Sequence, residues 1–277
     1  MTILVTGATG KVGRNVVAQL LDTGRPVRAI SRSPQRAGLP EDVEVLHADF
    51  ARPESLHTAL REVEKVFLFP SATGLRDFTA AASHAEVRHI VLLSSTVPGY
   101  DKPNPISEAH LAHERDVQDS GLPWTFVRPG GFMSNDLNWA ATIKTQGVVR
   151  DPFGDAGVAL IDERDIAAVA VTALIDDAHI GRTHEITGPH ALTAIERIRI
   201  LGQAIGRRLR FERQSSAEFT EQVTNEGYPA QYAEAVLEFG AYFDGRSGPV
   251  YPAVEHITGR PPHTYADWAA HHAPYFR

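Results

Sequence analysis

Three glycines near the start of the chain have the spacing of a phosphate-binding turn. They follow one another as Gly7-x-x-Gly10-x-x-Gly13, directly after an apolar run that begins at Ile3. Because glycine has no side chain, the backbone can turn tightly there and approach a phosphate closely. We therefore predict that this turn holds the pyrophosphate of a dinucleotide at the start of a helix. The residues expected to contact the cofactor are Gly7, Thr9, Gly10, Lys11, Val12 and Gly13.

Two alternatives stay open for this turn. The first glycine lies one position earlier than in the common G-x-G-x-x-G fingerprint, so a tight strand-to-helix turn without a ligand also fits. Lys11 lies inside the turn, where its ammonium group could contact a phosphate or face solvent.

The end of the second expected strand, residues 26–30, indicates which dinucleotide binds. An NAD site usually has an acidic residue about 20 positions after the glycines, where it binds the ribose 2′-hydroxyl. This chain has Ser31-Arg32-Ser33 there, without an acid. The planar, permanently charged guanidinium of Arg32 suits a 2′-phosphate, which predicts NADP(H) in preference to NAD(H). The alternative is that Arg32 is an exposed loop cation.

Three further strand ends carry residues that could contact the same cofactor. After strand 43–47, Asp49 could accept a hydrogen bond from the adenine amino group while Phe50 covers the ring. Asp49 could equally cap the helix that is expected to start near Pro53. The ends of strands 65–69 and 89–93 should flank the nicotinamide ring, through Phe69, Pro70, Ser71 and Ser94.

The elements that must position these residues alternate regularly in the first half of the chain. Near-continuous apolar strands separated by helices predict a parallel sheet covered on both faces, with ligands beyond the carboxyl ends of its strands. The expected strands are 3–5, 26–30, 43–47, 65–69, 89–93 and 124–127. The expected helices are 14–23, 53–62, 75–85 and 106–120.

The pattern is looser from residue 135 onwards. Expected helices are 135–146, 163–176, 193–206, 215–227, 229–243 and 264–273, and expected strands are 158–161, 183–187 and 208–213. We predict an α/β protein with a Rossmann-type, doubly wound parallel sheet in residues 1–150. A smaller, mainly helical substrate or lid region should occupy residues 151–277, partly interleaved with the first.

Composition narrows the functional classes. The 277 residues have a net charge of −7, which disfavours nucleic acid as a partner, and they include no cysteine, which excludes disulfides and thiolate catalysis. The 13 histidines have no metal-ligand spacing, so we expect no metal. No apolar run approaches the roughly 20 residues of a membrane span, and no signal peptide is expected. We expect a cytoplasmic monomer or homodimer with a small-molecule substrate.

Taken together, the motifs resemble those of the atypical short-chain dehydrogenase/reductases of the NmrA-like, NAD(P)-binding family, particularly bacterial NAD(P)H-dependent oxidoreductases. The resemblance covers nearly the whole chain. It rests on the glycine turn and on further motifs in this order: Ser31-Arg32, Ala48-Asp49, Leu93-Ser94-Ser95, His110-x-x-x-Glu114, Arg128-Pro129-Gly130, Asp162 to Ala167, Ile186 to Pro189 and Thr258 to Pro262. It implies a Rossmann-type domain, NADP(H) at the glycines and a small carboxyl-terminal substrate domain.

One departure concerns catalysis. Typical short-chain reductases use a Tyr-x-x-x-Lys pair, but here Tyr100 is followed four residues later by Asn104. Isoflavone-type relatives have a lysine at the position of His110, whose imidazole could protonate a carbonyl or quinone oxygen near neutral pH. Glu114, one helical turn on, could orient His110 or raise its pKa. The alternative is that the two residues bond for structure alone.

The sequence therefore predicts an NADPH-dependent oxidoreductase. Its acceptor is expected to be a small electrophilic, aromatic compound such as a quinone, an enone or a related carbonyl. A redox-sensing regulator that binds NADP(H) without turnover is the alternative, and an isomerase or epimerase that retains its cofactor is a third possibility. Residues that could wall an apolar substrate pocket, or serve packing alone, are Tyr100, Phe132, Met133 and Trp139.

Overall fold

A seven-stranded sheet forms the first layer of the protein. The computed structural model describes residues 2–70, 73–96 and 104–277. The strands lie in the order β3-β2-β1-β4-β5-β6-β8, and every neighbouring pair is parallel. Their bounds are β1 Thr2–Val5, β2 Val27–Ser31, β3 Val43–His47, β4 Val63–Leu68, β5 His89–Leu93, β6 Trp124–Pro129 and β8 Thr183–Ile186. The predicted Rossmann-type, doubly wound sheet is confirmed.

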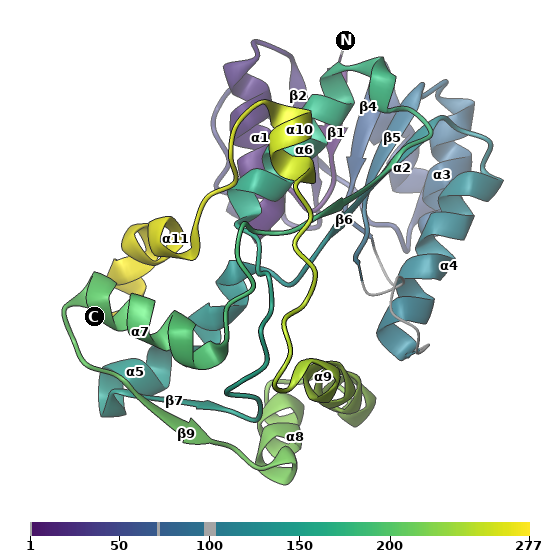
Figure 1. Ribbon diagram of the computed structural model, residues 1–277. Helices are drawn as coiled ribbons and strands as arrows, with labels where there is room; N and C mark the ends of the chain where they lie inside the picture. The colour runs from purple at the N-terminus through teal and green to yellow at the C-terminus, as the bar shows by residue number, and fades with distance from the viewer. Residues whose placement is uncertain (1, 71–72, 97–103) are drawn as a thin grey trace.

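Helices cover both faces of this sheet, as Figure 1 shows. One face carries α1 (Lys11–Asp22), α6 (Glu163–Ile175) and α10 (Ala253–Thr258), which share a core with the strands. The other face carries α2 (Leu56–Leu60), α3 (Leu75–His84) and α4 (Pro105–Asp119). Because both faces are covered, the central strands such as β4 and β5 are buried and mostly apolar, which is why the sequence pattern identified them. The edge strands β3 and β8 are only partly buried.

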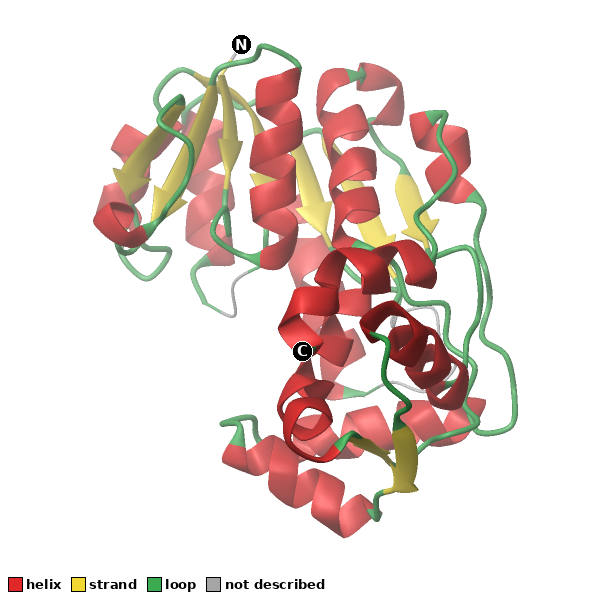
Figure 2. Cartoon of the chain, turned by 90° about the vertical axis from the view of Figure 1, so that its left-hand side faces the viewer, coloured by secondary structure: helices red, strands yellow, loops and turns green. Residues whose placement is uncertain are grey.

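A second, smaller region lies below the carboxyl ends of the strands (Figures 1 and 2). It contains a two-stranded parallel sheet of β7 (Val148–Asp151) and β9 (Arg210–Arg213). Its other elements are η4 Met133–Trp139, α5 Ala140–Gln146, α7 Ala194–Ile205, α8 Ser216–Asn225, α9 Ala230–Phe243, α11 Tyr265–His272 and η6 Ala273–Phe276. Its core includes Met133, Trp268 and Phe276.

Several predicted elements need correction. The strand expected over 158–161 is wrong, because Val158 and Ile161 each form only an isolated bridge, to Leu192 and to Phe132. The helix expected over 135–146 begins as a 3₁₀ segment at Met133. The short strand β7 and the six-residue helix α10 were not predicted. These elements are too short for hydrophobic periodicity to identify.

The chain crosses between the two regions more than once. Helix α6, strand β8 and helix α10 follow residue 150 but pack with the large sheet. A division into residues 1–150 and 151–277 stays a prediction. Over the described ranges, no helix has both the length and the apolarity to cross a membrane.

Candidate functional site

The glycine turn joins β1 to α1 at the carboxyl edge of the sheet. Gly7 has φ of 60°, and a Cβ atom there would lie 2.7 Å from the Cβ of Phe69. A Cβ on Gly13 would lie only 2.1 Å from the carbonyl oxygen of Gly7. The amide of Gly10 donates to that same oxygen at 2.9 Å. Both glycines therefore have a steric reason: a side chain at Gly13 would collide with the turn itself, and one at Gly7 would collide with Phe69 at the end of β4.

The amino terminus of α1 is open to an anion. Gly10 is the N-cap residue, makes no side-chain cap, and is followed by a first turn without an acidic residue. The first amide groups of a helix have no partner inside the helix, and the helix dipole adds positive potential there. A glycine-lined turn that ends at such a terminus is suited to a phosphate group. These residues therefore fit the pyrophosphate of a dinucleotide.

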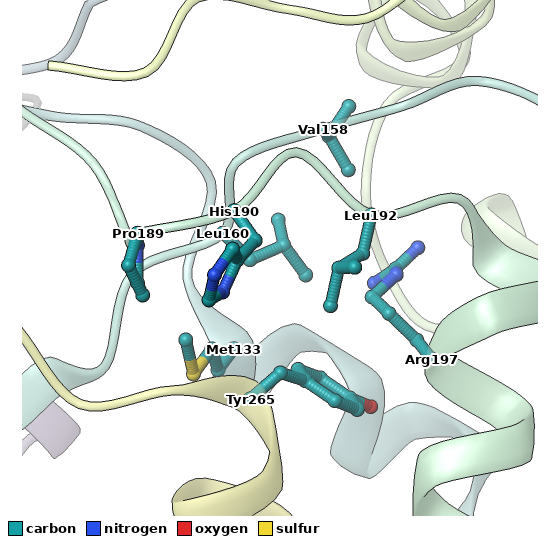
Figure 3. A pocket seen from close by; sticks show the side chains of 8 residues that line it. All are labelled: Met133, Val158, Leu160, Pro189, His190, Leu192, Arg197 and Tyr265. Carbon is teal, nitrogen blue, oxygen red and sulfur yellow. The ribbon is translucent and has the colours of Figure 1, made fainter.

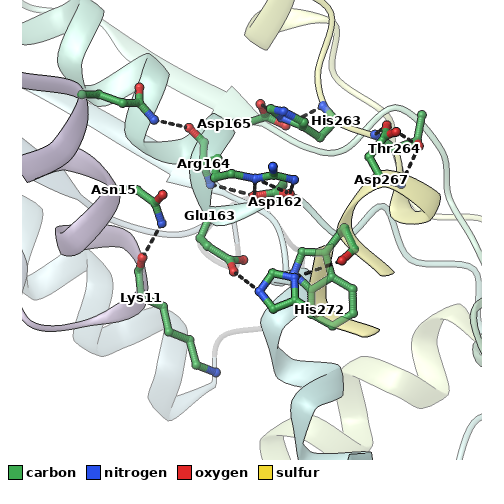
Figure 4. A network of polar contacts seen from close by, with 12 residues as sticks. Lys11, Asn15, Asp162, Glu163, Arg164, Asp165, His263, Thr264, Asp267 and His272 are labelled. Atoms are coloured by element: carbon green, nitrogen blue, oxygen red, sulfur yellow. Dashed lines mark hydrogen bonds and ion pairs between the residues drawn. The ribbon is translucent and has the colours of Figure 1, made fainter. Parts of the chain in front are cut away.

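Lys11 extends from this turn towards the second region. Its Nζ donates to the backbone carbonyl of Ser134 in η4 at 3.0 Å, and its own carbonyl accepts from Asn15 at 2.8 Å, as Figure 4 shows. The ammonium group thus links the glycine turn to the segment after β6. This link joins residues 123 positions apart in the chain. The sequence alone did not predict this contact.

Arg32 lies at the carboxyl end of β2, directly after Ser31. Its side chain is exposed. Among the described residues it has no hydrogen bond or ion pair, in contrast to Arg14 and Arg28, whose guanidinium groups are bonded. An exposed guanidinium at this strand end is available to an anion.

The structure separates the roles predicted for Asp49 and Phe50. An Asp49 oxygen accepts from the amide of Ala51 at 3.0 Å, and Asp49 does not cap the helix that follows. Phe50 is 9% exposed and stacks on Phe78 with ring centroids 4.7 Å apart. The ring of Phe50 therefore packs in the core beneath the sheet, a position that accounts for it without an adenine contact. The contact of Phe50 with the adenine ring stays a prediction.

The ends of β4 and β5 were expected to flank the nicotinamide. Phe69 is 46% exposed, and its amide donates to the hydroxyl of Thr6 at 2.7 Å, which fixes the end of β4 against the glycine turn. Pro70 is half-buried, and Ser71 lies outside the described residues. The Ser94 hydroxyl donates a hydrogen bond to Glu114 Oε1 at 2.6 Å, and this bond lies in the protein interior. The sequence analysis did not predict this role for Thr6.

Glu114 has a different partner from the one predicted. Nε and one terminal nitrogen of Arg128, at the end of β6, donate to its two carboxylate oxygens at 2.8 and 2.6 Å. These bonds to Glu114 raise the pKa of the Arg128 guanidinium. Glu114 is 4% exposed and also accepts from Ser94. Its oxygens are therefore engaged by residues on two strands, and it does not orient His110. The prediction of a His110–Glu114 pair is wrong.

His110 lies on α4, one turn before Glu114. Its Nδ1 atom is buried without a hydrogen-bond partner. Burial, followed by the charge of His113, lowers the pKa of His110 below its ordinary value of 6.5, and the weaker attraction of Glu114 does not reverse this. The charge of Glu114 does raise the pKa of His110, as expected, but burial and His113 outweigh it. His110 is thus a neutral imidazole at neutral pH.

The described residues among those predicted to line a substrate pocket pack against two different cores, that of the large sheet and that of the second region. Phe132 is half-buried and packs partly against the core of the large sheet. Met133 is 1% exposed and Trp139 is half-buried against the core of the second region. Tyr100 lies outside the described residues. Met133 also lines a narrow pocket (Figure 3), together with Val158, Leu160, Pro189, His190, Leu192, Arg197 and Tyr265.

A buried ionic cluster lies behind this pocket. Asp136 accepts two contacts from Arg197 Nη1 at 2.6 and 2.7 Å and one from the Tyr265 hydroxyl at 2.7 Å. Burial raises the pKa of Asp136 to about 6, although Arg197 opposes this. The Arg197 guanidinium lies over the ring of Trp139 at 4.9 Å. This cluster joins η4, α7 and α11, and the contact with Arg197 gives Trp139 a role in packing.

A second polar network holds the carboxyl-terminal segment against α6, as Figure 4 shows. Asp165 accepts from the amide of His263 at 2.7 Å and lies 2.6 Å from its Nδ1. Asp162 accepts from the Arg164 side chain, and Glu163 lies 3.6 Å from His272 Nε2. These contacts attach the second region to the large sheet. In the described part of the chain, no group of three or more His, Cys, Asp or Glu residues could hold a metal ion.

Comparison with known proteins agrees with this geometry. The model of the NAD(P)H-binding family matches residues 7–177. The (4-alkanoyl-5-oxo-2,5-dihydrofuran-3-yl)methyl phosphate reductase of Streptomyces griseus is 43% identical over 280 residues, which cover 99% of each chain. The NAD(P)H azoreductase of Xenophilus azovorans is 36% identical over 283 residues, again covering 99% of each chain.

Solved structures give the same result. The structure of an NADPH-dependent quinone oxidoreductase from Escherichia coli complexed with NADPH matches with a TM-score of 0.83 and 27% identity. The match covers 97% of this chain and 99% of that one. The turn before α1 that fits a phosphate, the parallel sheet and these relatives agree with one another. The chain therefore belongs to the NAD(P)H-binding family of atypical, NmrA-like short-chain reductases, and it is an NAD(P)H-dependent oxidoreductase.

Proposed function

We propose that this protein is an NADPH-dependent reductase of small electrophilic compounds with a conjugated, mostly aromatic π system, such as quinones, enones and related carbonyls. The observation that carries the cofactor choice is Arg32, an exposed guanidinium without a partner among the described residues, at the strand end that faces the adenosine ribose in this fold. Three relatives act by name on a quinone, an azo compound and an oxo-dihydrofuran phosphate, and this supports the acceptor class.

The proposed cofactor site follows the carboxyl edge of the sheet. The glycine turn and the amides of α1 hold the pyrophosphate, with Thr9, Lys11 and Val12 beside it. Arg32 binds the 2′-phosphate, and Asp49 lies at the adenine end with one carboxylate oxygen already bonded to Ala51. Phe69 and Pro70, with Ser71 and the backbone at Ser94, flank the nicotinamide. The bound cofactor supplies the hydride that the acceptor receives.

His110 is assigned the stabilisation of the acceptor oxygen during reduction. A neutral imidazole donates one N–H hydrogen bond, which stabilises the oxygen anion that hydride addition to a conjugated carbonyl creates. Water then supplies the proton that completes the reduction. Glu114 acts indirectly, because its bonds to Arg128 and Ser94 fix α4 and thereby the place of His110.

The second region is proposed to close the substrate site. Phe132 and Met133 follow β6 directly and are continuous with η4, whose Ser134 carbonyl binds Lys11 of the glycine turn. With Tyr100 and Trp139 they are the proposed apolar walls for the acceptor. We assign residues 1–150 mainly to cofactor binding and residues 151–277 mainly to substrate closure. The exceptions are η4, α5 and β7, which belong to the second region, and α6, β8 and α10, which pack with the large sheet.

The test is a turnover assay with the purified protein. NADPH or NADH is mixed with a panel of quinones, enones and azo compounds, and the loss of reduced-nicotinamide absorbance is followed. We expect NADPH oxidation with at least one acceptor and a kcat/KM for NADPH about tenfold or more above that for NADH. Tight NADPH binding without turnover of any acceptor would contradict the proposal and support a sensor of the NADP(H) ratio.

A further inference from the structure

Arg14, in the first turn of α1, holds two loops together. Its Nε donates to the carbonyl oxygen of Thr9 at 3.1 Å. Its terminal nitrogens donate to the carbonyl oxygens of Gly38 at 2.8 Å and Ala37 at 2.9 Å. Thr9 belongs to the glycine turn, whereas Ala37 and Gly38 lie in the loop between β2 and β3, directly after η1. One guanidinium thus connects the turn before α1 to the loop that carries Arg32.

The loop after β2 is built to a definite shape. It contains the 3₁₀ turn η1 (Pro34–Arg36), in which Arg36 donates to the Ser33 hydroxyl at 3.1 Å. Ala37 is 2% exposed, and Gly38 has φ of 55°, so the loop returns closely over α1. The carbonyl groups that Arg14 binds lie at this return. Arg14 therefore sets the distance between the glycine turn and the base of the Arg32 loop.

We propose that Arg14 is a positioning residue that determines the preference for NADPH by presenting Arg32 to the 2′-phosphate. The inference rests on the proposed function, in which Arg32 selects that phosphate. NADPH must satisfy two phosphate sites at once, the pyrophosphate at the glycine turn and the 2′-phosphate at Arg32. NADH uses only the first site. A clamp that fixes the separation of the two sites lowers the entropy lost on binding NADPH and has little effect on NADH.

The chemistry of the guanidinium explains why an arginine is needed. Its planar fork presents five N–H donors in fixed directions, so Nε and both terminal nitrogens can bind separate carbonyl groups. A lysine at the same place keeps the positive charge but has a single nitrogen, which cannot bridge Thr9 to Ala37 and Gly38 in this geometry. The Arg14→Lys variant therefore distinguishes two roles of Arg14: a clamp between the two loops, and a positive charge that simply attracts the phosphates.

The experiment measures dissociation constants of NADPH and NADH by fluorescence titration of the full chain. We expect Arg14→Lys and Arg14→Gln to weaken NADPH about tenfold and NADH less than about twofold. The side chain of Arg14 is exposed, so the variants should keep the fold, which a melting temperature checks. Arg199→Lys, on the exposed side of α7, is the matched control and should leave both constants unchanged.

A double-mutant cycle tests whether Arg14 acts through Arg32. Arg32→Ala alone should weaken NADPH far more than NADH. Arg14→Lys added to Arg32→Ala should then change NADPH binding less than about twofold, because no guanidinium remains to be presented. Additive effects of the two substitutions would show that Arg14 does not act through Arg32, and would overturn the inference.

The remaining outcomes separate this inference from the proposed function. If Arg32→Ala weakens NADPH and NADH equally, the proposed cofactor preference is wrong, and the inference fails with it. If Arg32→Ala behaves as expected but Arg14→Lys binds like the wild type, the preference stands and the clamp is refuted. Equal weakening of both cofactors by Arg14→Lys also refutes it, because Arg14 would then support only the glycine turn.

Discussion

At the scale of single residues, Gly13 has the least space of the glycines in the turn. Its missing Cβ would lie 2.1 Å from the Gly7 carbonyl oxygen, and backbone atoms cannot move away cheaply. Gly13→Ala should therefore distort the turn and weaken NADPH binding by about 100-fold or more. Gly181→Ala is the control for a glycine away from the turn, because Gly181 has φ of 73° but a Cβ there meets nothing within 4 Å. It should cost about 1–2 kcal/mol of stability and leave NADPH affinity intact. Unchanged NADPH affinity in Gly13→Ala would remove the glycine turn from the cofactor site.

His110 gives the second prediction at this scale. Because burial lowers its pKa below 6.5, its neutral form predominates between pH 7 and pH 8. We expect His110→Gln to lower kcat by about three- to tenfold without changing the affinity for NADPH. The shape of the pH–rate profile in that window should stay the same, since no titration of His110 contributes to it. A profile whose dependence on pH disappears in the variant would show instead that His110 is protonated and acts as a general acid.

At the scale of secondary-structure elements, the contact between Glu114 and Arg128 fixes α4 to the end of β6. Replacing one member leaves the other charge buried with few partners, and such changes typically destabilise proteins by about 3–5 kcal/mol. Arg128→Met should approach that range, since Glu114 is 4% exposed. The double variant Glu114→Met/Arg128→Met should regain part of the loss, because it buries no unpaired charge. Urea denaturation measures these differences. A double variant less stable than either single variant would contradict this account.

The same contact shows what position on a helix can and cannot predict. His110 and Glu114 lie on one face of α4 because they are four residues apart. That spacing made them candidates for a pair. The carboxylate instead binds Arg128 and Ser94, which reach it from β6 and β5. Parallel strands place their carboxyl ends beside one another, so residues distant in sequence lie close enough to hydrogen-bond Glu114.

At the scale of the whole molecule, two histidines should make stability depend on pH. Burial lowers the pKa of both His89 and His184 from 6.5 to about 4. His184 faces His179, at 3.0 Å between ring nitrogens, and Arg182, whose charge lowers its pKa further. A group with a lowered folded pKa binds protons more readily in the unfolded state, so stability falls as pH drops from about 6.5 towards 4.

A variant isolates this effect from the carboxyl groups. Asp136, whose pKa is raised to about 6, binds a proton more readily when folded and acts in the opposite direction. We therefore compare the free energy of unfolding of His184→Gln with that of the wild type at several pH values. The variant should gain stability relative to the wild type between pH 6.5 and pH 4, and the difference should level off above pH 7. A difference that does not depend on pH would show that His184 titrates normally in the folded protein.

Local patterns determined the sheet, the helices on it and the glycine turn. Strands buried on both faces are apolar along their length, and the collision of a Cβ at Gly13 is a property of the turn itself, so neither needed knowledge of distant residues. The collision at Gly7 is with Phe69 and depends on the end of β4. The family and the class of enzyme followed from motifs in their order along the chain. The short strand β7 and the isolated bridges at Val158 and Ile161 could not be predicted from local patterns, because such segments pair with residues far away in the sequence.

Only the tertiary structure decided which side chains meet. In the folded protein Phe50 stacks on Phe78 in the core, and Arg128 donates hydrogen bonds to Glu114. The Lys11 ammonium group donates to the carbonyl oxygen of Ser134. Hydrogen bonds and ion pairs act over a few ångströms, whereas these partners lie 14 to 123 residues apart in the chain. The sequence by itself determined the family and the class of enzyme, and it predicted a dinucleotide site at the start of α1. The packing of strand ends and loops decided which residues hold the surrounding site in place, because it sets the distances that short-range bonds require.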